Sequence, residues 1–148
     1  MTAIKWQNIV DALETRLKII SGMQVYHNDL GSRVYTWRSA PFQTADMPGI
    51  NIRDLSDTNI EEYLGNPNLT YHRLTVEIDL ACTTSAIARS MIADTCKAIN
   101  TDRTLGGYCI DIEYDGAEIL TNEQNENVIT GARVTVGVIY QTEKFEEE

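Results

Sequence analysis

The side chains that could carry chemistry are few and widely spaced. The only imidazoles belong to His27 and His72, and neither has a second His or Cys at the spacing of a metal ligand. The three thiols, Cys82, Cys96 and Cys109, form no CxxC pair. A Cys–His or Ser–His–Asp site would need residues that lie far apart in the sequence, and no spacing supports one. The sequence therefore predicts no catalytic, metal-binding or cofactor-binding residue.

The cysteines are expected to be reduced and mostly buried. Their odd number, in a chain whose first residues lack the layout of a secretory signal, indicates free thiols and a soluble intracellular setting. Cys82 and Cys96 fall on expected apolar faces and are interpreted as small buried hydrophobic residues. Cys109 falls on the outer face of an expected strand and is predicted to be the most reactive thiol.

Neighbouring carboxylates could in principle perform acid–base catalysis, which requires a shifted pKa in an apolar pocket. The pairs are Asp111 with Glu113, Glu77 with Asp79, and Glu61 with Glu62. They fall on the outward positions of alternating strands or in polar loops. A solvated surface is therefore the better interpretation of all three pairs.

The double glycine Gly106-Gly107 raises the question of a phosphate-binding loop. Such loops use the free N–H groups at the start of a helix, whereas these glycines follow the expected end of one. Asp102 stands nearby, and neither GxGxxG nor GxxxxGK[ST] is present. We expect the glycines to allow a sharp turn from helix to strand, with Leu105 filling the core at that corner.

Hydrophobic periodicity gives the elements that must position these residues. Steps of three and four predict helices over 4–20, with Thr2 as N-cap and Ser21-Gly22 as the stop, and over 85–100, opened by Thr84. Alternation predicts strands over 73–82, 108–114 and 128–140, and shorter strands over 24–28, 33–38, 49–55 and 117–120. The expected apolar face of the 108–114 strand comprises Tyr108, Ile110, Ile112 and Tyr114. Irregular structure is expected over 40–49, a long loop over 56–68, a hairpin turn at Asp115-Gly116 and a polar loop over 121–127.

This order of elements predicts an α+β fold. We expect a mainly antiparallel sheet with two helices packed on one face. The length of 148 residues fits a single domain over 1–148, and residues 142–148 are expected to fray as a charged tail.

The net charge of −10 argues against a DNA-binding surface and against docking on anionic lipid. No apolar run approaches the length of a membrane span. Between residues 102 and 127, seven acids accompany Arg103 alone. They are either a solvated face or a surface past which DNA moves without being held. The candidates for that surface are Asp111, Glu113, Asp115 and Glu118.

The outer face of the last strand carries little charge for a solvated surface. It comprises Ile129, Gly131, Arg133, Thr135, Gly137 and Ile139. A neighbouring subunit would suit this face, and a helix of the same chain would suit it equally. The interface candidates are Asp57, Glu61, Glu62, Arg133, Thr135 and Ile139.

Three stretches resemble a known family. They are IVDALETRLKIISG followed by MQVY, then DRTLGG at 102–107 after the second helix, and the closing strand RVTVGVIYQT at 133–142. Together with the length, they make the chain similar to the tail terminator (tail-completion) proteins of long-tailed phages, of the lambda-type minor tail protein U kind. Residues 40–68 have no counterpart in this resemblance.

The resemblance implies a structural protein of the virion and not an enzyme. Such a protein forms a ring, usually a hexamer, on the head-proximal end of the tail tube. Its implied partners are copies of itself, the tail tube protein and the head–tail connector protein, and DNA passes through the ring without being specifically bound. The implied location is the tail or neck of the virion, assembled in the bacterial host cytoplasm.

Two other functions remain open at this point. The chain could be another neck or connector subunit, or a tail-tube subunit. It could also be a small ligand-binding domain or an enzyme that uses the 56–68 loop as a lid.

Overall fold

Alternating apolar residues build the centre of the sheet. The computed structural model of the chain describes residues 4–21, 25–30, 33–60, 69–124 and 127–143, with the backbone alone at 44, 121–124 and 127–130. β3 (Leu69–Ala81) and β5 (Asn127–Glu143) pair antiparallel along almost their whole length. Leu74, Val76 and Ile78 lie opposite Val138, Val136 and Val134, and all six are buried. The expected strands over 73–82 and 128–140 are thus confirmed and are longer than predicted.

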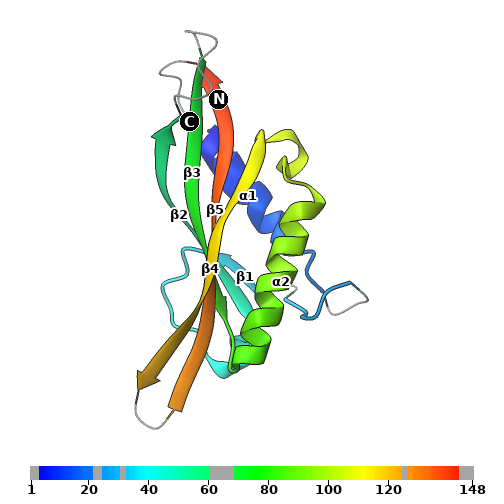
Figure 1. The fold of residues 1–148 in the computed structure, drawn as a ribbon, viewed down its shortest axis with the longest axis vertical. Coiled ribbons are helices and arrows are strands. Elements are labelled where there is room, and N and C mark those ends of the chain that lie inside the picture. The colour runs from blue at the N-terminus through cyan, green and yellow to red at the C-terminus, as the bar shows by residue number, and fades with distance from the viewer. Residues whose placement is uncertain (1–3, 22–24, 31–32, 61–68, 125–126, 144–148) are drawn as a thin grey trace.

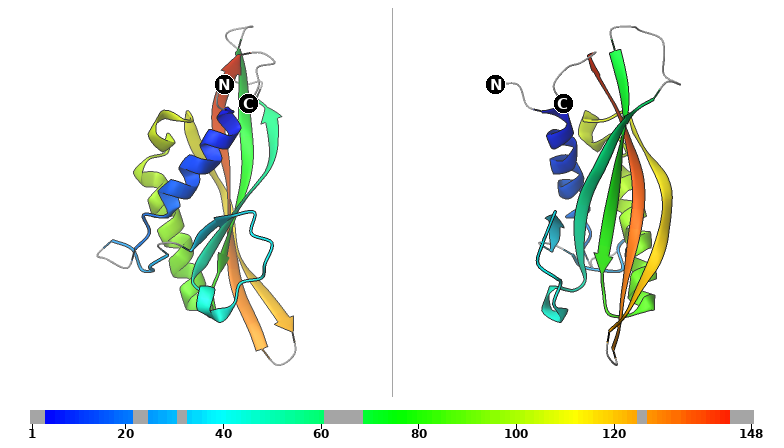
Figure 2. Two further views of the ribbon diagram at one scale, coloured as in Figure 1. Left: turned by 180° about the vertical axis from the view of Figure 1, so that it is seen from behind. Right: turned by 90° about the vertical axis from the view of Figure 1, so that its left-hand side faces the viewer.

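The sheet has five strands in the order β1-β2-β3-β5-β4 (Figure 1). β1 (Val34–Thr36) pairs parallel with β2 (Gly49–Asn59), and β4 (Asp111–Gln124) pairs antiparallel with β5. Helices α1 (Lys5–Leu17) and α2 (Ser85–Thr101) both lie on one side of the sheet (Figure 2). The other side, called here the open face, has no α-helix over it among the described residues, and the segment that contains Phe42 and Asp46 packs against its end at Gly49. The predicted α+β fold is confirmed.

Both predicted helices are present, with different boundaries at the first. α2 begins where expected, because the Thr84 hydroxyl accepts a hydrogen bond from the Ile87 N–H at 3.2 Å. α1 has Ile4 at its N-cap without a side-chain cap bond, so the predicted Thr2 cap is wrong. It ends at Leu17, before the predicted Ser21-Gly22 stop, yet Ile20 beyond it is still fully buried.

The chain turns sharply after α2, as predicted. A short 3₁₀ turn, η3 (Leu105–Gly107), leads into β4, and Leu105 is buried in the core. Gly106 has φ 72° and Gly107 φ 96°, which are left-handed conformations that favour glycine. A second short turn, η1 (Thr44–Asp46), interrupts the expected irregular segment before β2.

Three predictions of strands and turns are wrong. Residues 25–28 form no strand, because the backbone N–H groups of His27 and Asn28 donate to the buried Asp94 carboxylate of α2 instead. Asp115-Gly116 is not a turn. It is a β-bulge inside β4, which continues as one strand to Gln124. The predicted return strand over 117–120 is part of β4.

Three segments expected to be irregular are partly strand. Residues 56–59 of the predicted 56–68 loop belong to β2 and pair with 72–75 of β3, while 61–68 lie outside the described residues. The predicted 121–127 loop is largely strand, since Gln124 pairs with Asn127. Thr142 and Glu143, expected in a frayed tail, pair with β3 as part of β5, whereas 144–148 lie outside the described residues.

Tyr114 points to the same side of β4 as Ile112, but of the expected apolar face of the 108–114 strand only Ile112 is buried. Tyr108, Ile110 and Tyr114 are exposed. Tyr108 and Ile110 precede β4, and β4 is the outermost strand of the sheet. An outermost strand has a neighbour on one side only, so less of its surface is covered.

Candidate functional site

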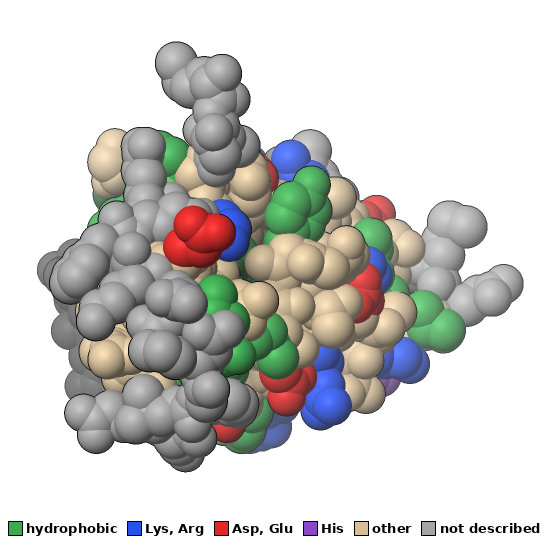
Figure 3. Space-filling model, turned by 90° about the horizontal axis from the view of Figure 1, so that it is seen from above, with side chains coloured by type: hydrophobic (Ala, Val, Ile, Leu, Met, Phe, Trp, Pro, Cys, Tyr) green, Lys and Arg blue, Asp and Glu red, His purple; other side chains and the backbone are tan. Residues whose placement is uncertain are grey.

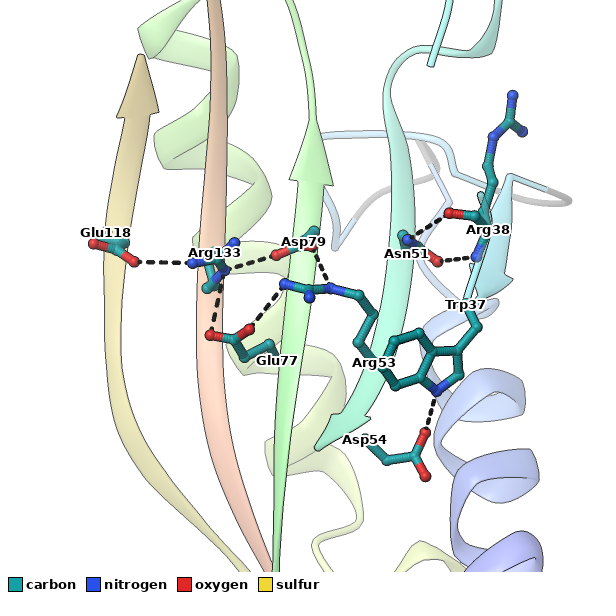
Figure 4. A network of polar contacts seen from close by, with 9 residues as sticks. All are labelled: Trp37, Arg38, Asn51, Arg53, Asp54, Glu77, Asp79, Glu118 and Arg133. Atoms are coloured by element: carbon teal, nitrogen blue, oxygen red, sulfur yellow. Dashed lines mark hydrogen bonds and ion pairs between the residues drawn. The ribbon is translucent and has the colours of Figure 1, made fainter. Parts of the chain in front are cut away.

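A chain of ion pairs crosses the open face of the sheet (Figure 4). Arg53 of β2 donates from Nη2 to Glu77 and from Nε to Asp79, both on β3 and both at 2.8 Å. These contacts form because Arg53 lies opposite Glu77 in the β2–β3 register. One guanidinium thereby ties two acids that sequence analysis assigned to a merely solvated face.

Arg133 of β5 extends the same chain to the far edge of the sheet. Its Nε lies 2.8 Å from the second oxygen of Asp79 and 3.5 Å from Glu77, and its Nη1 lies 3.5 Å from Glu118 of β4. The hydrogen bond to Asp79 is the main reason why the pKa of Arg133 is raised. Arg53, Glu77, Asp79, Arg133 and Glu118 are called here the arginine–carboxylate ladder, which joins four strands.

A second cluster lies on the same face beside β4. Arg73 of β3 donates from Nη2 to Asp115 and from Nε to Glu113, the latter at 3.1 Å. The hydrogen bond to Asp115 is the largest cause of the raised pKa of Arg73. The guanidinium lies over Gly137 of β5, where a Cβ atom would meet its Cζ at 2.1 Å. The small residue on this strand therefore makes room for an arginine of the same chain.

The acidic cluster seen in the sequence is largely neutralised in the fold. Glu113 and Asp115 contact Arg73, Glu118 contacts Arg133, and Asp111 lies 3.2 Å from Arg103. Acidic and basic side chains also lie beside one another when the molecule is seen along its long axis (Figure 3). A count of charges along residues 102–127 could not reveal these ion pairs, because Arg73 and Arg133 come from neighbouring strands.

Within these ion pairs, the acidic and the basic side chains are not equally exposed to solvent. The Glu118 side chain is 60% exposed against 27% for Arg133, and Glu113 is 49% exposed against 26% for Arg73. The arginines thus lie low on the sheet, while these carboxylates stand outside them. The pair Arg103–Asp111 is the exception, since both of its side chains are well exposed. The carboxylate is thus clearly the more exposed partner at Glu113 and Glu118, whereas Glu77 and Asp79 are about as exposed as Arg53 and Arg133.

The predicted interface residues do not form one surface. Arg133 and Thr135 lie on the open face and are partly exposed, but Ile139 is only 1% exposed and does not reach the surface. Asp57 lies on the helix-covered side of the sheet with its side chain almost fully buried. Glu61 and Glu62 lie outside the described residues.

Asp57 belongs to a buried polar chain that sequence analysis missed. His72 places its Nδ1 2.9 Å from Oδ2 of Asp57 and its Nε2 2.7 Å from the Thr142 hydroxyl. The Tyr140 hydroxyl donates to the same Asp57 oxygen at 2.7 Å, and its ring stacks on the imidazole. The residues come from β2, β3 and β5, so only the strand register brings them together. No local spacing could have revealed it.

This buried chain has the order of an acid, a base and a hydroxyl nucleophile. Its distances fit those of hydrolytic triads. Thr142 is only 1% exposed, however, so its hydroxyl is closed to a substrate in this structure. The other oxygen of Asp57 is buried and has no hydrogen-bond partner among the described residues. In this structure, the hydrogen bonds among these side chains link the ends of β2, β3 and β5.

The indole groups of two tryptophans hold the edge of β2. Trp6 of α1 and Trp37 after β1 donate from Nε1 to the two oxygens of Asp54, each at 2.6 Å. Next to them, the Asn51 side chain accepts from the Arg38 N–H and donates to the Arg38 carbonyl (Figure 4). These contacts fix the segment after β1 against β2, although β1 itself is only three residues long.

The cysteine predictions are corrected in one respect. Cys82 is buried, as expected, and Cys96 is partly buried. Cys109 is also buried, and burial with nearby carboxylates raises its pKa to about 12. The prediction that Cys109 is the most reactive thiol is therefore wrong for this fold. No group of three His, Cys, Asp or Glu side chains that could hold a metal is found within the described ranges.

In the turn at Leu105–Gly107, the N–H of Gly106 is not free to bind a phosphate. That N–H donates to the Asp102 carboxylate at 2.8 Å, and the Thr104 hydroxyl donates to the other Asp102 oxygen at 2.7 Å. The Thr104 contact is the largest cause of the lowered pKa of Asp102, followed by the Gly106 contact. An internal carboxylate thus occupies the position that an anion would need.

An apolar groove of about 730 Å³ runs between α2 and the edge strand β4. Its lining includes Ile99 of α2, Ile112 and Tyr114 of β4, and Val134 and Val136 of β5. Lys97, Arg103, Asp111 and Glu113 also border it. The groove lies on the helix-covered side of the sheet, next to a strand that has no partner on its outer side among the described residues.

Comparison with known proteins leaves the chain without an assigned family. No family model matches it, and no curated protein matches it either. No helix in the described part of the chain is both long and apolar enough to cross a membrane.

Proposed function

We propose that this chain is a structural subunit of a phage tail that forms a ring at the head-proximal end of the tail tube. The ring, with six copies as the expected number, ends tube polymerisation and joins the tail to the head connector. Its partners are copies of itself, the tail tube protein and the connector protein. The proposal places it in the virion after assembly in the bacterial host cytoplasm, without catalytic activity.

The observation that carries this proposal is the open face of the sheet. Its outermost carboxylates, Glu113 and Glu118, are more exposed than the arginines Arg73 and Arg133 that pair with them. Because Arg53, Arg73 and Arg133 are all paired with carboxylates, this face can hold the phosphates of DNA only weakly. A channel through which a genome passes needs a surface that does not bind DNA. The resemblance in sequence and the net charge of −10 point in the same direction.

The shape of the molecule supports the same function. The sheet is longer than the helix layer and extends beyond it at both ends (Figure 1). The ends of β2, β3 and β5 extend at one end, and the β4–β5 hairpin extends at the other. A ring that joins two different partners needs contacts on two opposite faces, which these ends would provide.

The test is to measure the mass of the purified chain, alone and with tail tube protein, by native mass spectrometry and electron microscopy. A ring that caps the tubes and limits their length is the expected result. The proposal is wrong if the chain stays monomeric at tens of micromolar and tubes grow equally long with and without it.

Another neck subunit, or a subunit of the tube itself, would share the same surfaces. Particles that lack the protein separate these functions by electron microscopy. Overlong or unjoined tails indicate a terminator, whereas short or absent tails indicate a tube component.

A further inference from the structure

The sheet has two open edges, one on each side. β1 pairs only with residues 50–52 of β2, so the stretch from Arg53 to Asn59 has no strand beside it among the described residues. On the other side, β4 is outermost over all 14 of its residues. Open edges carry unpaired N–H and C=O groups that can pair with another chain.

Both edges also expose large apolar side chains. Tyr114 and Ile119 lie on β4, and Leu55 lies on β2 with Trp37 beside it. Trp37 and Tyr114 expose more than half of their surface. An open strand edge that exposes large apolar side chains is a liability for a monomer.

The strand directions make the two edges complementary. β2 is antiparallel to β3, β3 to β5, and β5 to β4, so β2 and β4 run in opposite directions. If a second copy is placed beside the first in the same orientation, its β2 therefore meets the first copy's β4 antiparallel. This pairing continues the alternation of the sheet and uses the more stable ladder pattern.

The groove between α2 and β4 adds apolar surface to the same edge. Ile99, Ile112 and Tyr114 line it on the helix-covered side. A strand added to β4 would extend the sheet under this groove and cover its open side. The groove and the edge would thus be buried by one partner.

From these features we infer that β4 of one copy pairs with residues 53–59 of β2 in a second copy of this chain. The contact is heterologous, since the two surfaces differ, so repetition of it generates a ring or a filament. The inference rests on the proposed self-association and specifies which surfaces carry it. In a ring built this way, the open faces of all copies form one continuous sheet surface.

The test uses two edge variants of the full chain and a matched control. Tyr114→Lys blocks β4 in the row of Asp54, and Leu55→Lys with Ser56→Lys blocks β2, all at exposed positions. Val25→Lys adds a charge at an exposed apolar residue outside the sheet. Native mass spectrometry should show the oligomer for the wild type and for Val25→Lys, and monomers for each edge variant.

Mixing the two edge variants gives the sharper result. Each variant keeps one intact edge, so the equimolar mixture should form heterodimers and nothing larger. Heterodimers also show that both variants are folded. If the wild type is monomeric, the proposed function falls together with this inference. If the wild type forms rings but the edge variants do so too, or if the mixture gives no heterodimer, only this inference is overturned.

Discussion

Gly137→Ala should destabilise the protein only when Arg73 is present. A Cβ atom at this position would lie 2.1 Å from Cζ, 2.3 Å from Nη2 and 2.6 Å from Nε of Arg73. These three nearest atoms all belong to the movable end of the Arg73 side chain. Arg73 must therefore leave its position and release Glu113 and Asp115.

The size of the effect follows from two opposing changes. The ion pairs of Arg73 with Glu113 and Asp115 are partly exposed, so together they contribute roughly 1–2 kcal/mol. Alanine in a strand is itself favoured over glycine by roughly 0.5–1 kcal/mol. Gly137→Ala should thus lower the free energy of unfolding by about 0.5–1 kcal/mol in the wild type. In an Arg73→Ala background, it should raise that free energy by about as much.

Urea unfolding of the wild type, both single variants and the double variant measures this coupling directly. The coupling energy should be about 1–2 kcal/mol and should shrink in about 1 M NaCl, where the Debye length falls to roughly 3 Å. Gly131→Ala is the control, because its Cβ would meet the backbone oxygen of Leu80 at 3.0 Å and no arginine. The reasoning is refuted if Gly137→Ala has the same effect with and without Arg73.

Three further predictions concern buried groups. Thr142→Val removes the hydroxyl bonded to Nε2 of His72, so it should lower the free energy of unfolding by about 1–3 kcal/mol. Thr142→Ser keeps a hydroxyl and should lower that free energy less. Equal decreases for the two variants in urea unfolding would contradict this role of the hydroxyl. The raised pKa of Cys109, about 12, leaves little thiolate at neutral pH, so alkylation of Cys109 should accelerate as the pH rises toward that value. Mass spectrometry measures the labelling of each cysteine. Faster labelling of Cys109 than of Cys96 at about pH 8 would refute this prediction. Asp94→Asn replaces a buried carboxylate that accepts hydrogen bonds from the backbone N–H groups of His27 and Asn28. Hydrogen exchange at these two amides should become at least about tenfold faster. An unchanged exchange rate would show that the carboxylate does not hold them.

The sequence predicted the parts of the fold that depend on long periodic patterns. Alternation over 73–82 and 128–140 identified the two central strands, because both are buried on one side by helices. Thr84 identified the start of α2, because an N-cap is a local signal. These elements need no knowledge of their neighbours.

Where a neighbouring element decides the structure, the sequence was misleading. Asp115-Gly116 has the composition of a hairpin turn, yet pairing with β5 keeps β4 continuous and leaves only a bulge. Asp94 holds the segment that was predicted as a strand over 24–28, and no local pattern marks an acid on a helix as buried. Cys109 was placed outside because the strand was expected to begin before it.

For the candidate site, the sequence predicted which residue types are present but not which side chains contact one another. The acids of β4 could be counted in the sequence, but their partners Arg73 and Arg133 are assigned by the β3–β5 and β4–β5 registers. The contact between His72 and Asp57 likewise depends on the β2–β3 register. A shift of one residue in any pairing would move these side chains to the opposite face.

The two bulges of the sheet would curve a sheet that is extended by the proposed contact. One lies in β2 after Asp54, and the other lies in β4 after Tyr114. Asp54 pairs with Val76, Val76 with Val136, and Val136 with Tyr114, so both bulges begin in one row across the sheet. Bulged strands bend and twist more strongly than regular ones. Since both edge strands bend at the same level, the joined sheet would curve at each contact, and a ring closes where that turn is a whole fraction of a full circle without a rise per copy.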